Sequence, residues 1–277
     1  MKANQNIIPF PLPGKDRANY RLTDQCYLAC DNCFTDSGPY GARGLPTEGA
    51  KQLIGSLKGW GIERVHFTGG EPFVRNDTPE LISYATGIGL RSSVLSTGYR
   101  IPDLGAPTLR LLDRAQISVD GRQEYHDSHR KNLVGKGSYG IAIAAIEHLR
   151  RNDVPVEISA TISLQNTKEL EHVADLASQY GAKVIVRGKI PLGRATGMDY
   201  SIEGTSQQIH EAVLQEKARL EDMFGNGIFT QDIFDFVPLQ PGMANRHSPA
   251  VTISPQGTIL SPDGKTISLV ELIREAA

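Results

Sequence analysis

Strand-like and helix-like segments alternate six times along this 277-residue chain, and no other feature constrains its fold as strongly. Short runs rich in β-branched residues, such as ERVHFT at 63–68, each lead into a segment with helical spacing of apolar residues. Strand–helix alternation places parallel strands in one sheet with helices outside, and right-handed crossovers curl that sheet. The pattern therefore predicts an α/β fold: a partial (β/α)6 TIM-like barrel with a small C-terminal extension.

Two of the predicted helices carry signals at their ends. Residues 46–61 are expected to form a helix with Thr47 as its N-cap and with one apolar stripe. Residues 166–181 are expected to form another, which ends at Gly181 because glycine readily takes the left-handed conformation of a helix end.

The sequence pattern divides the chain into three parts. Residues 1–18 are a proline-rich N-terminal arm, residues 19–204 contain the strand–helix units, and residues 205–277 form the C-terminal extension. Within the extension we expect a helix over 205–224, a hairpin at VTISPQGTIL with its turn at Pro-Gln-Gly, and a short final helix over 268–276.

The composition is that of an ordinary globular protein, with 39% hydrophobic residues, 22% charged residues and a net charge of -2. Nucleic-acid binding, which usually brings a basic excess, is not supported. The chain has no run of about 18 apolar residues that would predict a membrane span, and its first residues lack the apolar region of a signal peptide. We therefore expect a cytoplasmic protein without nucleic-acid or membrane partners.

All three cysteines lie in the stretch CYLACDNCF, as Cys26, Cys30 and Cys33 with the spacing C-x3-C-x2-C. A packing role would scatter them, and they are too close together for a disulfide framework. A structural zinc site needs four ligands, so a histidine would have to supply the fourth. Three thiolates on a four-iron cluster leave one iron open, as catalysis at a metal requires. The spacing favours a cluster, with zinc or unligated thiols as alternatives.

A second motif, HFTGGEP at 66–72, follows the next predicted strand. Gly69 and Gly70 let the backbone approach a ligand closely, and Pro72 fixes the turn after Glu71. Taken alone, such a segment is more often a tight turn. Because functional loops gather beyond the carboxyl ends of parallel strands, we expect this segment and the cysteines to share one site.

With these motifs, the chain resembles the radical S-adenosylmethionine (radical SAM) superfamily. The resemblance spans about residues 19–195 and rests on CYLACDNC, GGEP, ISVDG and PLGRA in that order. It implies that the cysteines hold a [4Fe–4S] cluster and that S-adenosylmethionine binds the open iron through its amino and carboxylate groups. It further implies reductive cleavage to a 5'-deoxyadenosyl radical, hydrogen abstraction from a substrate, and an external electron donor of the flavodoxin or ferredoxin type.

The resemblance also assigns residues to the methionine end of the cofactor. Gly69, Gly70 and Glu71 are expected to bind the methionine ammonium, for which a carboxylate and exposed carbonyls are suitable partners. Ser96 and Thr97, at the end of the third strand, occupy a place where the family often contacts the cofactor.

Three further residues follow from the resemblance, each with a simpler interpretation. Ser118 and Asp120 in ISVDG are expected to bond ribose or carboxylate, although Ser118 alone would suit a strand end and Asp120 an Asx-turn. Arg130 matches an arginine that pairs with the methionine carboxylate, and otherwise would be a solvated charge. The family often has an aromatic residue just before the third cysteine. Here Asn32 stands there and Phe34 follows, which puts the adenine contact in doubt.

Candidates for substrate contact are few. Arg187, Lys189 and Arg194 lie at and after the sixth predicted strand, where they would clamp a carboxylate or phosphate or remain solvated. The sequence does not single out a catalytic proton or hydrogen donor. Three aromatic residues of the extension are interpreted as core, with cavity wall as the alternative: Phe229, Phe234 and Phe236.

The C-terminal extension is similar to the SPASM or twitch extensions of superfamily members that modify peptides or natural products. In those members cysteines hold auxiliary clusters, but here Pro241 and Ser261 stand roughly where they would be. We interpret 241–263 as a cluster-free remnant that packs against the barrel. No cysteine follows Cys33, so we expect a redox-neutral rearrangement or elimination.

Two classes of function remain on these grounds. The first is a radical SAM enzyme that acts on a small biosynthetic intermediate, with a peptide as the alternative substrate. The second is a non-catalytic cluster protein that keeps the fold for binding a partner. The intact cysteine motif beside an intact GGEP favours the enzyme.

Overall fold

Nine strands in the described part of the chain form one sheet in the order β6-β5-β4-β3-β2-β1-β7-β8-β9. The computed structural model describes residues 16–189, 191–197, 199–230, 250–260, 266–268 and 270. Neighbouring strands from β6 across to β7 run parallel, whereas β8 and β9 are antiparallel to their neighbours. The strands are β1 (Arg17–Arg21), β2 (Arg64–Thr68), β3 (Arg91–Ser96), β4 (Leu112–Ser118), β5 (Val156–Ile162), β6 (Lys183–Gly188), β7 (Ala250–Ile253), β8 (Thr258–Leu260) and β9 (Thr266–Ser268).

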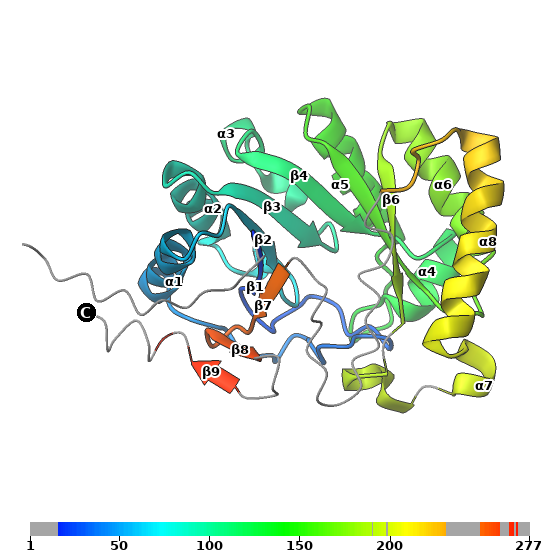
Figure 1. The fold of residues 1–277 in the computed structure, drawn as a ribbon, viewed down its shortest axis with the longest axis horizontal. Helices are drawn as coiled ribbons and strands as arrows, with labels where there is room; N and C mark the ends of the chain where they lie inside the picture. Colours follow the sequence, from blue (N-terminus) through cyan, green and yellow to red (C-terminus); the bar gives the residue numbers. More distant parts are fainter. Residues whose placement is uncertain are drawn as a thin grey trace, which may run out of the picture.

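The six predicted strands are confirmed, and they curl into a half-barrel with helices on its outer side (Figure 1). The larger helices are α1 (Thr47–Gly59), α2 (Thr78–Gly87), α5 (Tyr139–Arg151), α6 (Glu169–Tyr180) and α8 (Ser206–Phe224). The smaller ones are α3 (Ala106–Leu109), α4 (Gln123–His129), α7 (Tyr200–Glu203) and the 3-10 turns η1 (Pro72–Val74), η2 (Ile101–Asp103) and η3 (Gly193–Gly197). None of the described helices is long and apolar enough to cross a membrane.

The strands separate an apolar outer face from a polar interior. Ala18 and Tyr20 of β1 are fully buried in the hydrophobic core that the helices share with the sheet. Because successive side chains of a strand point to opposite faces, the residues between the core positions face into the barrel. His66, Gln116 and Glu157 are such residues, buried although polar. A polar, water-excluding barrel interior is suited to holding a polar ligand.

The helix-end predictions had different outcomes. Gly181 ends α6 with a φ of 58°, as expected. The prediction of Thr47 as N-cap is wrong, because Pro46 occupies that position and no side chain caps the helix. The Thr47 hydroxyl instead donates to Asp77 Oδ2 at 2.6 Å, which joins the starts of α1 and α2. The sequence pattern also did not predict α4.

The C-terminal extension adds to the sheet by strand pairing. The predicted hairpin is confirmed as β7 and β8, and β7 pairs with β1 in parallel as a seventh barrel strand. Phe229 is buried in the core, in agreement with that interpretation. Four other predicted residues of the extension lie outside the described residues: Phe234, Phe236, Pro241 and Ser261. The predicted final helix at 268–276 also lies mainly outside them, and its first residue, Ser268, is the last residue of β9.

Candidate functional site

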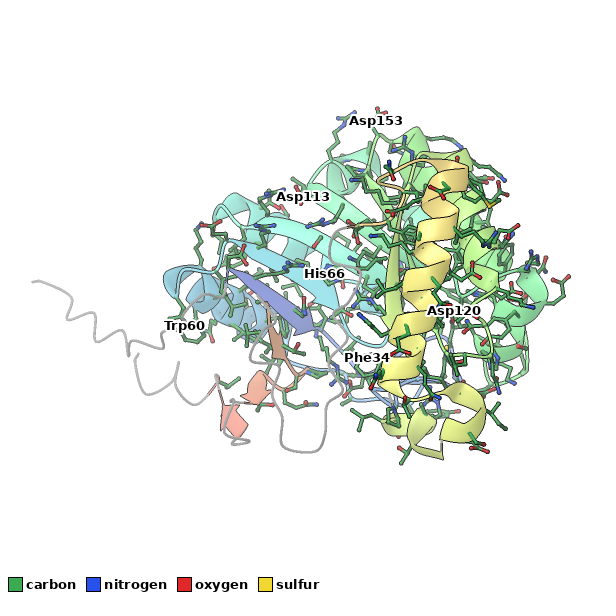
Figure 2. All side chains as sticks on the ribbon, turned by 45° about the vertical axis from the view of Figure 1, so that its right-hand side comes forward. Phe34, Trp60, His66, Asp113, Asp120 and Asp153 are labelled. Atoms are coloured by element: carbon green, nitrogen blue, oxygen red, sulfur yellow. The ribbon has the colours of Figure 1, made fainter. Side chains whose placement is uncertain are left out.

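The loops that follow the barrel strands meet at one end of the barrel, where they enclose a cavity of about 180 Å³. Figure 2 shows Phe34 of the cysteine loop and Asp120 at this end, Asp113 and Asp153 at the opposite end, and His66 between them. The cavity brings together most of the residues predicted from sequence: Cys26, Cys30, Cys33, Gly69, Gly70, Ser96, Thr97, Ser118, Arg130, Arg187 and Arg194. The predicted residues Glu71, Asp120 and Lys189 are not among those that line it.

The three cysteines are free thiols on the loop after β1. The Leu28 N–H donates to Cys26 Sγ at 3.4 Å, and the Ser37 N–H donates to Cys33 Sγ at 3.3 Å. Burial raises the pKa of Cys26, and it raises the pKa of Cys30 to about 11 although the Arg130 guanidinium acts in the opposite direction. Such thiols ionise when a metal binds, because the positive charge of the metal compensates the negative charge of the buried thiolate.

The donor set suits an iron–sulfur cluster. No three His, Cys, Asp or Glu side chains within the described residues are grouped to hold a single metal ion. In a four-iron cluster each thiolate binds a different iron, so its cysteines surround a cavity rather than converge on a point. Three cysteine sulfurs, two of which accept from backbone N–H groups, and nearby arginines are suited to the ligands and hydrogen bonds of such a cluster.

The two glycines of GGEP hold the loop after β2 against the cysteine loop. The Gly70 N–H donates to Thr23 O and the Glu71 N–H donates to Gln25 O, both at 2.8 Å. A Cβ on Gly70 would collide with the Gln25 carbonyl, and Gly69 has a φ of 141°. Close backbone contact between the two loops therefore requires glycine at these positions.

Glu71 is fully buried and bonded to the end of β3. Its carboxylate accepts hydrogen bonds from the Thr97 N–H at 2.8 Å, the Thr97 hydroxyl at 2.6 Å, the Ser96 hydroxyl at 3.0 Å and the Phe73 N–H at 3.2 Å. Burial raises the pKa of Glu71, and these four donors only partly offset that effect. The carboxylate thus orients Ser96 and Thr97, which line the cavity in front of it.

Asp120 and Arg130 form a buried ion pair across the loop after β4. The Arg130 Nε–H donates to Asp120 Oδ2 at 2.5 Å and a terminal nitrogen donates to Oδ1 at 3.1 Å, while the Thr161 N–H donates to Oδ1 at 2.8 Å. Burial alone would raise the pKa of Asp120, but the Arg130 charge and the hydrogen bonds from Arg130 and the Thr161 N–H, with the nearby His126, together outweigh it, and the pKa is lowered. Asp120 therefore orients Arg130, which lines the cavity.

The three predicted substrate-contacting cations occupy different surroundings. Arg187 of β6 lines the cavity and donates to Ser159 Oγ at 3.1 Å and to Gln116 Oε1 at 2.8 Å. Lys189 forms an ion pair with Glu203. Arg194 lines the cavity, and its guanidinium bonds to the cysteine loop.

Sequence reasoning missed two cavity residues on β5, Ser159 and Thr161. Both face the interior because they alternate with the core residues Ile158, Ala160 and Ile162. That alternation was visible in the sequence, and it would have identified them once β5 was assigned to the barrel.

A half-barrel whose loops bring three cysteines, a double glycine and a buried arginine into one cavity defines a site for a metal cluster and a polar cofactor. The family model described as the radical SAM superfamily matches residues 20–178, more than half of the chain. The chain therefore belongs to the radical SAM superfamily, whose members use a [4Fe–4S] cluster and S-adenosylmethionine.

Among curated proteins, the chain is similar to the mycofactocin maturase MftC of Mycolicibacterium smegmatis, with 34% identity over 193 residues, 68% of this chain and 48% of the relative. It is also similar to an AdoMet-dependent heme synthase of Oleidesulfovibrio alaskensis, with 33% identity over 182 residues, 64% of this chain and 46% of the relative. The chain spans about half the length of these curated relatives.

Solved structures share the fold at low sequence identity. SuiB of Streptococcus suis bound to S-adenosylmethionine matches with a TM-score of 0.68 and 12% identity, over 94% of this chain and 65% of that one. The enzyme anSMEcpe with bound AdoMet matches with a TM-score of 0.67 and 16% identity, over 90% of this chain and 74% of that one. These similarities support the half-barrel architecture.

Proposed function

We propose that this chain is a radical SAM enzyme that cleaves S-adenosylmethionine reductively and abstracts hydrogen from a small biosynthetic intermediate. The observation that carries the proposal is the single cavity onto which Cys26, Cys30, Cys33, Gly70 and Arg130 converge. When bound, a [4Fe–4S] cluster supplies the single electron that cleaves the sulfonium, and an external flavodoxin or ferredoxin supplies that electron in turn.

Different residues of the chain bind the cluster, the methionine ammonium and the methionine carboxylate. The three cysteines hold the cluster, and Gly69 with Gly70 brings backbone carbonyls close to the methionine ammonium. Ser96 and Thr97, oriented by Glu71, provide hydroxyl groups beside it. Arg130, held by Asp120, is suited to the methionine carboxylate, because arginine recognises carboxylates through planar, paired hydrogen bonds.

The cavity wall also favours an anionic substrate group. The charged residues that line it in the described part of the chain are three arginines: Arg130, Arg187 and Arg194. Arg187 lies on β6, and its guanidinium bonds to Ser159 and Gln116. We assign it to a carboxylate or phosphate of the substrate.

The reaction is proposed to be redox-neutral, a rearrangement or an elimination. No cysteine of this chain follows Cys33, so it offers neither cysteine ligands for an auxiliary cluster nor a further thiol as hydrogen donor. A peptide is the second candidate substrate, because a solved structure of similar fold, SuiB, is bound to the precursor peptide SuiA and MftC is a maturase.

The test is anaerobic turnover. Reconstituted protein with dithionite should convert S-adenosylmethionine to 5'-deoxyadenosine, measured by chromatography. Fully loaded protein that forms none would support the non-catalytic alternative. The enzyme is then incubated with the small-molecule fraction or the peptide fraction of an extract from deuterated cells. The fraction that contains the true substrate transfers deuterium to 5'-deoxyadenosine, which distinguishes the two substrate classes.

A further inference from the structure

The loop after β6 reaches across the barrel mouth and binds the cysteine loop. The Arg194 Nε–H donates to Cys30 O at 2.7 Å, and one terminal nitrogen donates to Ser37 O at 2.5 Å. The other terminal nitrogen donates to Asp36 Oδ1 at 2.9 Å. The Arg194 backbone N–H adds a bond to Cys33 O at 3.0 Å. One residue therefore holds the cysteine loop at four points.

Gly193 makes this approach possible. Its φ is 58°, and a Cβ there would lie 2.5 Å from Cys33 O and 2.8 Å from Asp36 N. Real Cβ atoms do not come this close to backbone, so any side chain would push the two loops apart. Gly193 and Arg194 are adjacent in the sequence, and the contact between the two loops depends on both.

The contacted segment is the part of the loop that carries the second and third cysteines. Cys33 Sγ also accepts from the Ser37 N–H, and the Thr35 and Ser37 hydroxyls are bonded to each other at 2.8 Å. Arg194 thus fixes the carbonyls on either side of the Cys33 thiol. The guanidinium also places a positive charge against the Cys30 carbonyl, within the segment that carries two of the cysteines.

We propose that Arg194 is a positioning residue for the iron–sulfur cluster: it clamps the Cys30–Ser37 loop from the far side of the barrel and tunes the cluster with its charge. This rests on the proposed function insofar as the cysteines hold a cluster. A nearby cation stabilises the reduced, more negative cluster relative to the oxidised one. The hydrogen bonds separately hold the loop in the geometry in which the cysteines ligate.

Two substitutions separate the charge from the hydrogen bonds. Arg194→Gln removes both, whereas Arg194→Lys keeps the charge but lacks the planar guanidinium whose three nitrogens each reach a different acceptor. The matched control is Arg91→Gln, which removes an arginine bonded to Asp113 at the opposite end of the barrel. Each protein is reconstituted anaerobically, and iron content, cluster release to a chelator and midpoint potential are measured, with circular dichroism to verify folding.

Arg194→Gln is expected to lose its cluster to the chelator at least about tenfold faster than wild type, since a hydrogen bond from a charged donor typically contributes a factor of this size or more. Its midpoint potential should be more negative. Arg194→Lys should release the cluster fast but keep a near-normal potential, and Arg91→Gln should match wild type. If Arg194→Gln does not fold, Gly193→Ala, which retains Arg194, should show the same fast release of the cluster.

Two results would overturn the inference. One is an Arg194→Gln protein whose cluster release and potential equal those of wild type while only substrate turnover falls, which would make Arg194 a substrate ligand. The other is equal loss in Arg91→Gln. If wild-type protein itself binds no cluster, the proposed function fails instead, so the two failures are distinguishable.

Discussion

Replacement of Glu71 tests how the edge of the cavity proposed to bind methionine is built. In Glu71→Ala the N–H groups of Thr97 and Phe73 lose their acceptor inside the protein, whereas the Ser96 and Thr97 hydroxyls can rotate to other partners. An unsatisfied buried donor costs about 1–3 kcal/mol, so the two backbone groups together cost roughly 2–6 kcal/mol. At about 2–4 °C per kcal/mol for a domain of this size, that corresponds to a fall in melting temperature of roughly 4–24 °C.

The pH dependence gives the experiment a second readout. Burial raises the pKa of Glu71 above its ordinary value of 4.5, so the native protein retains this proton to higher pH than the unfolded chain. The resulting stability is fully present below pH 4.5 and is lost as the pH rises through the native pKa. The difference in stability between wild type and Glu71→Gln should therefore shrink as the pH rises over this window.

The assay is thermal unfolding of cluster-free protein by circular dichroism across a pH series, with Glu71→Gln as the isosteric partner of Glu71→Ala. Cofactor binding is measured in parallel on the loaded protein, where affinity should fall about ten- to a hundredfold because Ser96 and Thr97 lose their orientation. A melting temperature for Glu71→Ala within about 2 °C of wild type would refute the reasoning. So would a difference from Glu71→Gln that grows with pH.

Three further predictions concern the cysteine loop. Anaerobically reconstituted protein should contain about four iron and four sulfide per chain; Cys30→Ala should abolish both the colour and the formation of 5'-deoxyadenosine, and an active variant would contradict the assignment. Gly70→Ala should displace the Gln25 carbonyl and lower iron content without abolishing folding, as measured by iron analysis and circular dichroism; normal iron content would show that the loops tolerate a Cβ here. Electron paramagnetic resonance of reduced protein should show one cluster, absent when Cys26, Cys30 and Cys33 are all replaced; a surviving signal would exclude the redox-neutral proposal.

The fold was largely predictable because strand and helix periodicities alternate without interruption from β1 to β6. Local signals near helix ends were less reliable. Thr47 has the chemistry of an N-cap, yet its hydroxyl bonds to Asp77, thirty residues away. The seven-residue helix α4 was not predicted because QEYHDSH carries no continuous apolar stripe and includes just one fully buried position, His126.

The site was predictable where a motif is continuous and unpredictable where its partners are distant. Cysteine spacing and the double glycine identified two loops, and their side-by-side position follows from parallel topology. The resemblance assigned Glu71 to the cofactor, which stays a prediction; that its carboxylate also bonds to Ser96 and Thr97 could not be read from the sequence. Likewise, no local pattern could reveal that Arg194 reaches Cys30, because that contact exists only after the barrel has curled.

The pairing of β1 with β7 has a consequence for the order in which the molecule forms. The strand β2 begins at Arg64, after the cysteine loop and α1, but β7 begins only at Ala250. During synthesis the outer edge of β1 must therefore stay open until β7 has left the ribosome, and open strand edges invite pairing with other chains. The cysteine loop follows β1, which is therefore the last of the strands β1–β5 to acquire both of its neighbours. Iron delivered before β7 has paired would meet this loop while β1 lacks one neighbour, which favours cluster insertion after that pairing.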